Sequence, residues 1–214
     1  MMKPYYETPL GKLYHGDCLS IMPELEPVDL VLTDPPYGIN IKSHGQNFIG
    51  MTEIVGDGSH ILYTWLDSLN LPLCAFYSPY RPPDIKWRSI LVWSKGGHVG
   101  GGGDIATCWK RDFELIGVKN NLPLNGKRDI SVLNYNAISP PPSGHVAEKP
   151  VALMVYLVKK IPATLVVDPF IGSGTTAIAC ERLKRKWIGI EIEEKYCEIS
   201  ARRIEAERKQ LKLF

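Results

Sequence analysis

Short apolar runs alternate with amphipathic segments along most of the chain, and few folds tolerate this pattern. Such runs are typical of buried parallel strands, and segments with helical spacing follow several of them. Strands are expected at Lys12 to His15, Val28 to Thr33, Leu73 to Ser78, Ile90 to Trp93, Phe113 to Val118, Thr164 to Val167 and Trp187 to Ile190. Helices are expected at about Ser59 to Leu69, Lys149 to Lys160, Thr175 to Leu183 and Glu193 to Lys209. The pattern predicts an α/β fold with a mostly parallel sheet of about seven strands and helices on both faces.

The length favours one large domain. The 214 residues can bury a sizeable core and contain no internal repeat or linker, so residues 1–214 are expected to form a single domain. Three stretches do not fit the sheet: Gly38 to Gly58, Lys95 to Asp104 and Asn120 to Gly144. Segments of this kind in a compact domain are often lids or binding loops. The middle stretch contains GGHVGGGGD, whose glycines match no phosphate-loop pattern and indicate flexibility.

The charge balance neither supports nor excludes a nucleic-acid partner. The formal net charge of +2 is too small for whole-protein attraction to a polyanion. The cysteines are odd in number and never spaced as CxxC, which argues against a disulfide framework or zinc site and favours a reducing cytosol: Cys18, Cys74, Cys108, Cys180 and Cys197. The N-terminal segment lacks the apolar core of a signal peptide, and no apolar run approaches the roughly 18 residues of a membrane span. Neither export nor membrane insertion is expected.

The first chemical motif is VDLVLTDPPYG. A buried strand ends there in Asp34, Pro35, Pro36 and Tyr37, at the carboxyl edge where open α/β sheets bind ligands. The prolines stiffen the backbone and leave its carbonyls free to accept hydrogen bonds. A simple strand-to-loop stop is the alternative interpretation.

These residue types suit methylation of an exocyclic base amine. The amine of adenine or cytosine is a poor nucleophile because its lone pair is delocalised into the ring. A carboxylate and a carbonyl that accept its two hydrogens favour a pyramidal nitrogen, and both strengthen as positive charge develops. Asp34 and the Pro35 carbonyl fit these roles. Tyr37 supplies a ring for a base that has left the duplex stack.

The second motif is TLVVDPFIGSGTTAIA. A hydrophobic strand leads into Asp168, then into a turn with Gly172, Ser173 and Gly174, then into small residues suited to close helix packing. The next strand ends in Glu191, 17 residues beyond Gly174. This spacing is near the roughly 20 residues at which an acidic side chain meets a ribose hydroxyl pair.

The second motif has three other interpretations. A P-loop needs Gly-Lys-Ser or Gly-Lys-Thr, whereas Thr175 follows Gly174, which argues against ATP or GTP. A dinucleotide fingerprint stays open because Ala177 can stand at its last position. A bland tight turn explains the glycines, but it does not explain Asp168 and Glu191 together with them.

DPPYG and DPFIGSGTT together resemble the motifs of DNA amino-methyltransferases. The catalytic motif precedes the cofactor motif, which is similar to the beta-class arrangement, a circular permutation of the Rossmann-like S-adenosylmethionine-dependent methyltransferase fold. LYHGDCLSIM, HVAEKPVALMVYLV and GIEIEEKYCEISARR resemble further segments of the family. RDFELI is similar to a family strand that packs beside the target base, with a structural role for Phe113.

The resemblance implies S-adenosylmethionine as the cofactor and no metal. Glu191 would meet its ribose, Asp17 its adenine and Asp168 its methionine side. The cofactor-binding residues implied are Asp17, Cys18, Asp34, Lys149, Pro150, Asp168, Pro169, Phe170, Gly172, Ser173, Gly174, Thr175, Glu191 and Ile192. Taken singly, Asp17 can also be a turn residue and Glu191 a solvated helix cap.

Two residue types suggest other chemistry that the sequence does not support. The histidines have no metal-ligand spacing: His15, His44, His60, His98 and His145. Cys18 is not accompanied by a Pro-Cys motif, so it is interpreted as packing and not as a methyl-accepting nucleophile.

The resemblance implies double-stranded DNA as the partner, in methylation of the restriction-modification type. Adenine N6 is the preferred target because family members with Asp at the first tetrapeptide position are mostly similar to adenine enzymes; cytosine N4 is the alternative. Recognition would come from loops 38–58, 95–104 and 120–147, with Lys119, Lys127 and Arg128 available for phosphates or guanine edges.

Other outcomes stay open at this point. A chain this short leaves little room for a recognition domain, so either specificity is relaxed or a second subunit, as in a homodimer, completes the site. The alternatives from other classes are an RNA or protein amide methyltransferase, a nicotinamide-dependent oxidoreductase and a non-catalytic DNA-binding module.

Overall fold

The computed structural model describes residues 2–36, 61–96, 103–104, 109–110, 112–119, 124–138 and 148–211. The N-terminal half contains β1 (Tyr6–Glu7), β2 (Gly11–His15), α1 (Cys18–Ile21), η1 (Met22–Glu24), β3 (Leu30–Thr33), α2 (Ile61–Ser68), β4 (Leu73–Tyr77) and β5 (Ser89–Ser94). The C-terminal half contains β6 (Gly103–Asp104), β7 (Trp109–Lys110), β8 (Phe113–Lys119), β9 (Val132–Asn134), α3 (Val151–Lys160), β10 (Leu165–Asp168), α4 (Thr175–Arg182), β11 (Lys186–Glu191) and α5 (Glu194–Leu211).

Nine strands of the described residues form one sheet in the order β1-β2-β11-β10-β3-β4-β8-β5-β9. The neighbours from β2 to β4 in this order are all parallel. β8 runs antiparallel to both β4 and β5, and β1 runs antiparallel to β2. The N-terminal strand β2 pairs with the C-terminal strand β11, as a circular permutation requires. The expected permuted, mostly parallel α/β fold is therefore confirmed.

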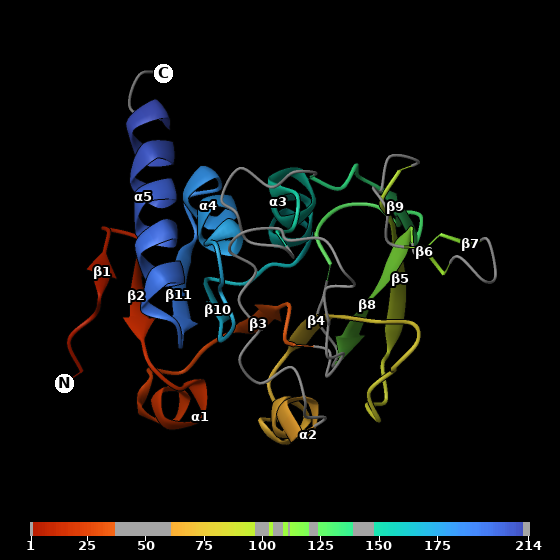
Figure 1. Ribbon diagram of the computed structural model, residues 1–214, viewed down its shortest axis with the longest axis horizontal. Coiled ribbons are helices and arrows are strands. Elements are labelled where there is room, and N and C mark those ends of the chain that lie inside the picture. The colour runs from red at the N-terminus through yellow and green to blue at the C-terminus, as the bar shows by residue number, and fades with distance from the viewer. Residues whose placement is uncertain are drawn as a thin grey trace.

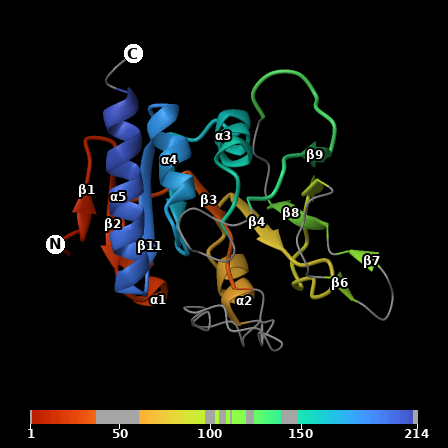
Figure 2. The ribbon, with the colours of Figure 1, turned by 45° about the horizontal axis from the view of Figure 1, so that its top comes forward.

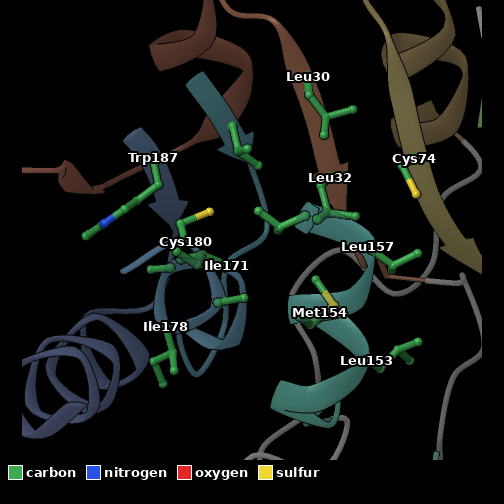
Figure 3. Packing of buried hydrophobic residues seen from close by; sticks show 14 of the residues in the cluster. Leu30, Leu32, Cys74, Leu153, Met154, Leu157, Ile171, Ile178, Cys180 and Trp187 are labelled. Atoms are coloured by element: carbon green, nitrogen blue, oxygen red, sulfur yellow. The ribbon is translucent and has the colours of Figure 1, made fainter. Parts of the chain in front are cut away.

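Helices cover both faces of this sheet. In Figures 1 and 2, α3, α4 and α5 lie side by side on one face, and α1 and α2 lie on the other. Successive strand residues point to opposite faces, so each central strand contributes to two cores. On β3, Leu30 and Leu32 pack in the core beneath α3 and α4 (Figure 3), whereas Val31 packs in the core beneath α1 and α2.

The expected strands and helices all occur, with ends within two residues of the predicted ones; the first residues of the helix expected from Ser59 lie outside the described residues. The sheet has two strands more than the expected seven, β1 and β9, which are its two outermost strands. These strands contain only two and three residues, too few to show an alternating pattern. β9 lies within the stretch from Asn120 to Gly144 that was not expected to join the sheet.

No helix in the described ranges is long and apolar enough to cross a membrane. Four cysteines in these ranges are free and buried: Cys18, Cys74, Cys180 and Cys197.

Candidate active site

Four acidic residues follow four adjacent parallel strands. Asp17 follows β2, Glu191 ends β11, Asp168 ends β10 and Asp34 follows β3. The strands lie in that same order across the sheet. Because the strands are parallel, the acids form a row along one side of the sheet, which we call the carboxyl edge. At about 4.8 Å per strand, the row spans roughly 14 Å.

The chain leaves two neighbouring strands toward opposite faces at this edge. β10 leads into α4 on one face, and β3 leads toward α2 on the other (Figure 1). The two strands are paired directly, with Val166 opposite Leu30 and Val167 opposite Val31. In open α/β sheets such a switch of direction opens the ligand-binding crevice. Asp168 and Asp34, from the two sequence motifs, stand on either side of this switch in direction.

Asp168 ties the two strand ends together. Its buried carboxylate accepts hydrogen bonds from Thr33 Oγ1 at 2.7 Å, Thr176 Oγ1 at 2.5 Å and the Phe170 amide at 3.1 Å. Burial raises the pKa of Asp168 to about 6, although these hydrogen bonds oppose the shift. The carboxylate therefore fixes the turn that leads from β10 into α4.

The glycine turn is held from the side of β11 and α5. The Gly172 amide donates to Glu191 Oε2 at 2.9 Å, and Ser200 Oγ of α5 donates to the Gly172 carbonyl at 2.7 Å. Gly174 caps α4 in the left-handed conformation, with φ of 84°. Arg203 adds a hydrogen bond to the Ser173 carbonyl. These hydrogen bonds hold the turn in place, and Pro169 and Thr175 beside it are buried.

Glu191 and Asp17 both have local structural partners. Glu191 Oε1 accepts the Glu193 amide at 2.9 Å, and burial raises the pKa of its carboxyl group. Asp17 is exposed and caps α1 by accepting the Leu19 amide at 2.9 Å. Asp17 therefore fits the simple turn interpretation, whereas Glu191 is buried and is not a solvated helix cap. Both acids stand at the carboxyl edge.

The neighbours of these two acids differ in exposure. Cys18 is buried, and burial raises the pKa of its thiol to about 12, which agrees with a packing role. Ile192 is 48% exposed at the carboxyl edge.

Asp34 is paired with Lys149. The ammonium of Lys149 donates to Asp34 Oδ2 and lies 3.3 Å from Glu114 Oε2. Lys149 and Pro150 are buried immediately before α3, and Pro150 is the N-cap of that helix. The fold thus brings Lys149 to the Asp-Pro-Pro-Tyr motif. Tyr37, the last residue of that motif, lies outside the described residues.

Sequence reasoning missed two residues beside this pair. Glu114, near the start of β8, binds Lys149 and also Lys95, which follows β5. A signal was present: a lone acid in the apolar run FELIGVK shares the face of Ile116, which is in the core beneath α3. Phe113 beside it is 36% exposed, and the structural role expected for it stays a prediction.

The basic residues expected to contact DNA lie on the opposite side of the sheet, where its parallel strands begin. We call this side the amino edge. Lys119 ends the antiparallel strand β8 and is paired with Asp67 of α2. Lys127 and Arg128 precede β9, and the Lys127 carbonyl accepts from Lys160 at the end of α3. Their position separates them from the two motifs, and their expected contact with DNA stays a prediction.

Part of the expected recognition surface cannot be placed. The stretch 38–58 and most of 95–104 lie outside the described residues, as do residues 120–123 and 139–147. In the parts that are described, no group of three or more His, Cys, Asp or Glu side chains is arranged to hold a metal ion.

Comparisons with known proteins agree with this geometry. A family model described as DNA methylase matches residues 76–202, more than half of the chain. The Type II methyltransferase M.ScaI of Streptomyces caespitosus is 27% identical over 98% of this chain and 86% of its own length.

Solved structures share the fold. A structure of the M1.HpyAVI–SAM complex aligns with a TM-score of 0.66 and 23% identity, over 91% of this chain and 99% of the other. The PvuII DNA methyltransferase, described as cytosine-N4-specific, aligns with a TM-score of 0.69 and 18% identity, over 93% of this chain and 88% of the other.

Proposed function

Because the chain belongs to the DNA methylase family, we propose that it transfers a methyl group from S-adenosylmethionine to an exocyclic amine of a base in double-stranded DNA. The observation that carries this proposal is the row of acids along the carboxyl edge, which ends with Asp34. A row roughly 14 Å long suits an extended ligand that joins a nucleoside to an amino acid.

The residues at the edge fit this cofactor. Glu191, buried at the end of β11, offers carboxylate oxygens to a ribose, and exposed Asp17 offers them to an adenine amine. The backbone of the turn from Asp168 to Thr175 would hold the methionine portion, with Phe170 beside it. When bound, S-adenosylmethionine supplies an electrophilic methyl group on its sulfonium.

Asp34 and the Pro35 carbonyl would grip the target amine. Both accept its hydrogens, and together they favour the pyramidal nitrogen whose lone pair attacks. Asp34 then takes up the proton that the methylated nitrogen releases. Tyr37 would stack on the base after it leaves the duplex.

Adenine N6 is the proposed target, on the strength of Asp at the first position of the tetrapeptide. Cytosine N4 is the second candidate, because the fold also aligns with that of a cytosine-N4-specific enzyme. Mass spectrometry of nucleosides from DNA methylated by the pure protein distinguishes the two bases.

The proposal also includes residence in the cytoplasm and a homodimer that completes DNA recognition. The four free buried thiols support a reducing compartment. Sedimentation in the presence of DNA tests the homodimer.

A variant of the tetrapeptide tests the proposal. Asp34→Ala is expected to abolish transfer of a tritiated methyl group, because the amine loses its charged acceptor. It is expected to leave the Kd for S-adenosylmethionine, measured by calorimetry, nearly unchanged. An active Asp34→Ala variant, or a wild-type protein that does not bind S-adenosylmethionine, would contradict the proposal.

A further inference from the structure

Four charged side chains from four segments form one linked cluster at the carboxyl edge. Lys95 Nζ lies 2.6 Å from Glu114 Oε1, and Lys149 bridges Glu114 and Asp34. The side chains of Lys149, Glu114 and Lys95 are 6%, 13% and 17% exposed, and that of Asp34 is 21% exposed. The cluster contains two positive and two negative groups, so its charges balance within a largely buried space.

The alternation of strand residues explains why these groups meet. Lys95 continues the face of Trp93 on β5, Glu114 that of Ile116 on β8, and Asp34 that of Leu32 on β3. All three strands present this face to the core on which α3 packs, and Lys149 stands just before α3. Three members of the cluster therefore stand at strand ends, and the segment before α3 supplies the fourth.

The surroundings of Lys149 favour its protonated form. Its Nζ lies 5.2 Å from the ring centroid of Phe76 and 5.8 Å from that of Trp93. Burial alone would lower the pKa of Lys149, but the Asp34 and Glu114 carboxylates raise it above its ordinary value. The ammonium thus needs a carboxylate partner at every stage of a reaction at Asp34.

Asp34 faces two competing demands. In this structure it accepts from the Lys149 ammonium, whereas methyl transfer requires it to accept from the base amine. A carboxylate that turned away would leave a buried lysine without compensation unless another anion held it, and an uncompensated buried charge is costly. Glu114 is that anion, and Lys95 balances Glu114 on its other side.

We propose that Glu114 is a positioning residue for Asp34 that acts through Lys149, retaining the Lys149 ammonium when Asp34 exchanges it for the amine of the target base. The exchange moves hydrogen bonds only, since Lys149 keeps its protons throughout. The inference rests on the proposed function, because it takes Asp34 as the acceptor of the amine.

Glu114→Gln is the primary test. This substitution keeps the shape of the side chain and removes its charge, so Lys149 loses one of the two carboxylates that it pairs with in the described residues. The expected result is a fall in kcat for DNA methylation of about tenfold or more, with unchanged affinity for S-adenosylmethionine. Glu114→Asp keeps the charge and is expected to retain more activity than Glu114→Gln. A matched control is Glu207→Gln, which removes the carboxylate that pairs with Arg182. The Glu207 side chain is 11% exposed, similar to that of Glu114, and this variant should leave kcat unchanged.

A double substitution separates positioning from a general structural effect. In a Lys149→Met background, Glu114→Gln should cause no further fall in kcat, because the residue through which Glu114 acts is gone. An undiminished further fall would overturn the inference. If Lys149→Met does not fold, the two single variants decide. Equal losses of kcat in Glu114→Gln and Glu114→Asp would overturn the inference, and a clearly higher kcat in Glu114→Asp would support it. If the wild-type protein methylates DNA and the Glu114→Gln variant is fully active, only this inference is contradicted. If the wild-type protein does not methylate DNA, the proposed function is contradicted.

Discussion

Asp168 shows how one residue can couple stability to pH. Its carboxyl group is 4% exposed, and burial raises its pKa from 3.8 to about 6 against the hydrogen bonds of Thr176 and Thr33. Because the pKa is higher in the folded protein than in the unfolded chain, folding favours the protonated form. The stabilisation that results is complete at pH values below the unfolded pKa, and it is lost as pH rises through about 6.

Asp168→Asn should therefore become more stable relative to wild type as the pH rises. The amide keeps the size of the group and has no ionisation to suppress. Between about pH 5 and about pH 8, the free energy of unfolding of the variant should gain about 1 kcal/mol relative to that of wild type. Urea unfolding at the two pH values measures this difference. A difference that is constant with pH, or that moves in favour of wild type, would contradict the assigned role of burial.

Some of the site residues could be identified from the sequence, and one could not. Asp34, Asp168 and Glu191 each stand directly after a recognisable strand, so the rule for parallel sheets predicted their edge. Glu114 could not be found in this way, because its contact with Lys149 depends on the antiparallel insertion of β8 between β4 and β5. A lone acid on a core face was the only sign.

Elements were predictable where their periodicity extends over several residues. The long helix α5 and the apolar strand β10 were found from sequence, whereas β1 and β9 exist only through pairing with a neighbouring strand. The way elements pack was less accessible. The approach of α5 to the glycine turn is set by Gly174, where a Cβ atom would lie 2.8 Å from Ser200 Oγ.

Gly174→Ala and Gly126→Ala together isolate this packing contact. Both glycines have positive φ, of 84° and 76°, so each substitution forces alanine into the left-handed region at a cost of about 1 kcal/mol. Gly126 has nothing within 4 Å of an added Cβ, whereas Gly174 meets α5. Gly174→Ala is expected to lower the free energy of unfolding by about 1 kcal/mol more than Gly126→Ala, measured by urea unfolding. Equal losses of unfolding free energy in the two variants would show that α5 can move away from the added Cβ atom at little cost.

At the scale of the whole molecule, the direction of the strands divides the charged residues between the carboxyl and amino edges of the sheet. The acids of the candidate site and the exposed residues Tyr80 and Arg81, which follow β4, lie at the carboxyl edge. Lys127 and Arg128 lie at the amino edge. With a net charge of only +2, the protein has no general attraction for DNA, so which edge carries a given cation matters. A duplex that delivers a base to Asp34 must approach the carboxyl edge.

Arg81→Ala and Arg128→Ala are matched substitutions on the two edges. Each arginine that neutralises a phosphate releases a counterion, so its loss reduces the slope of log K against log salt concentration by about 1. Arg81→Ala is expected to reduce the slope by that amount, and Arg128→Ala to leave it unchanged, in equilibrium binding to a duplex at several salt concentrations. The reverse result would mean that DNA binds the amino edge. Asp34 and the cofactor motif would then face away from the nucleic acid, and the base amine could not reach them.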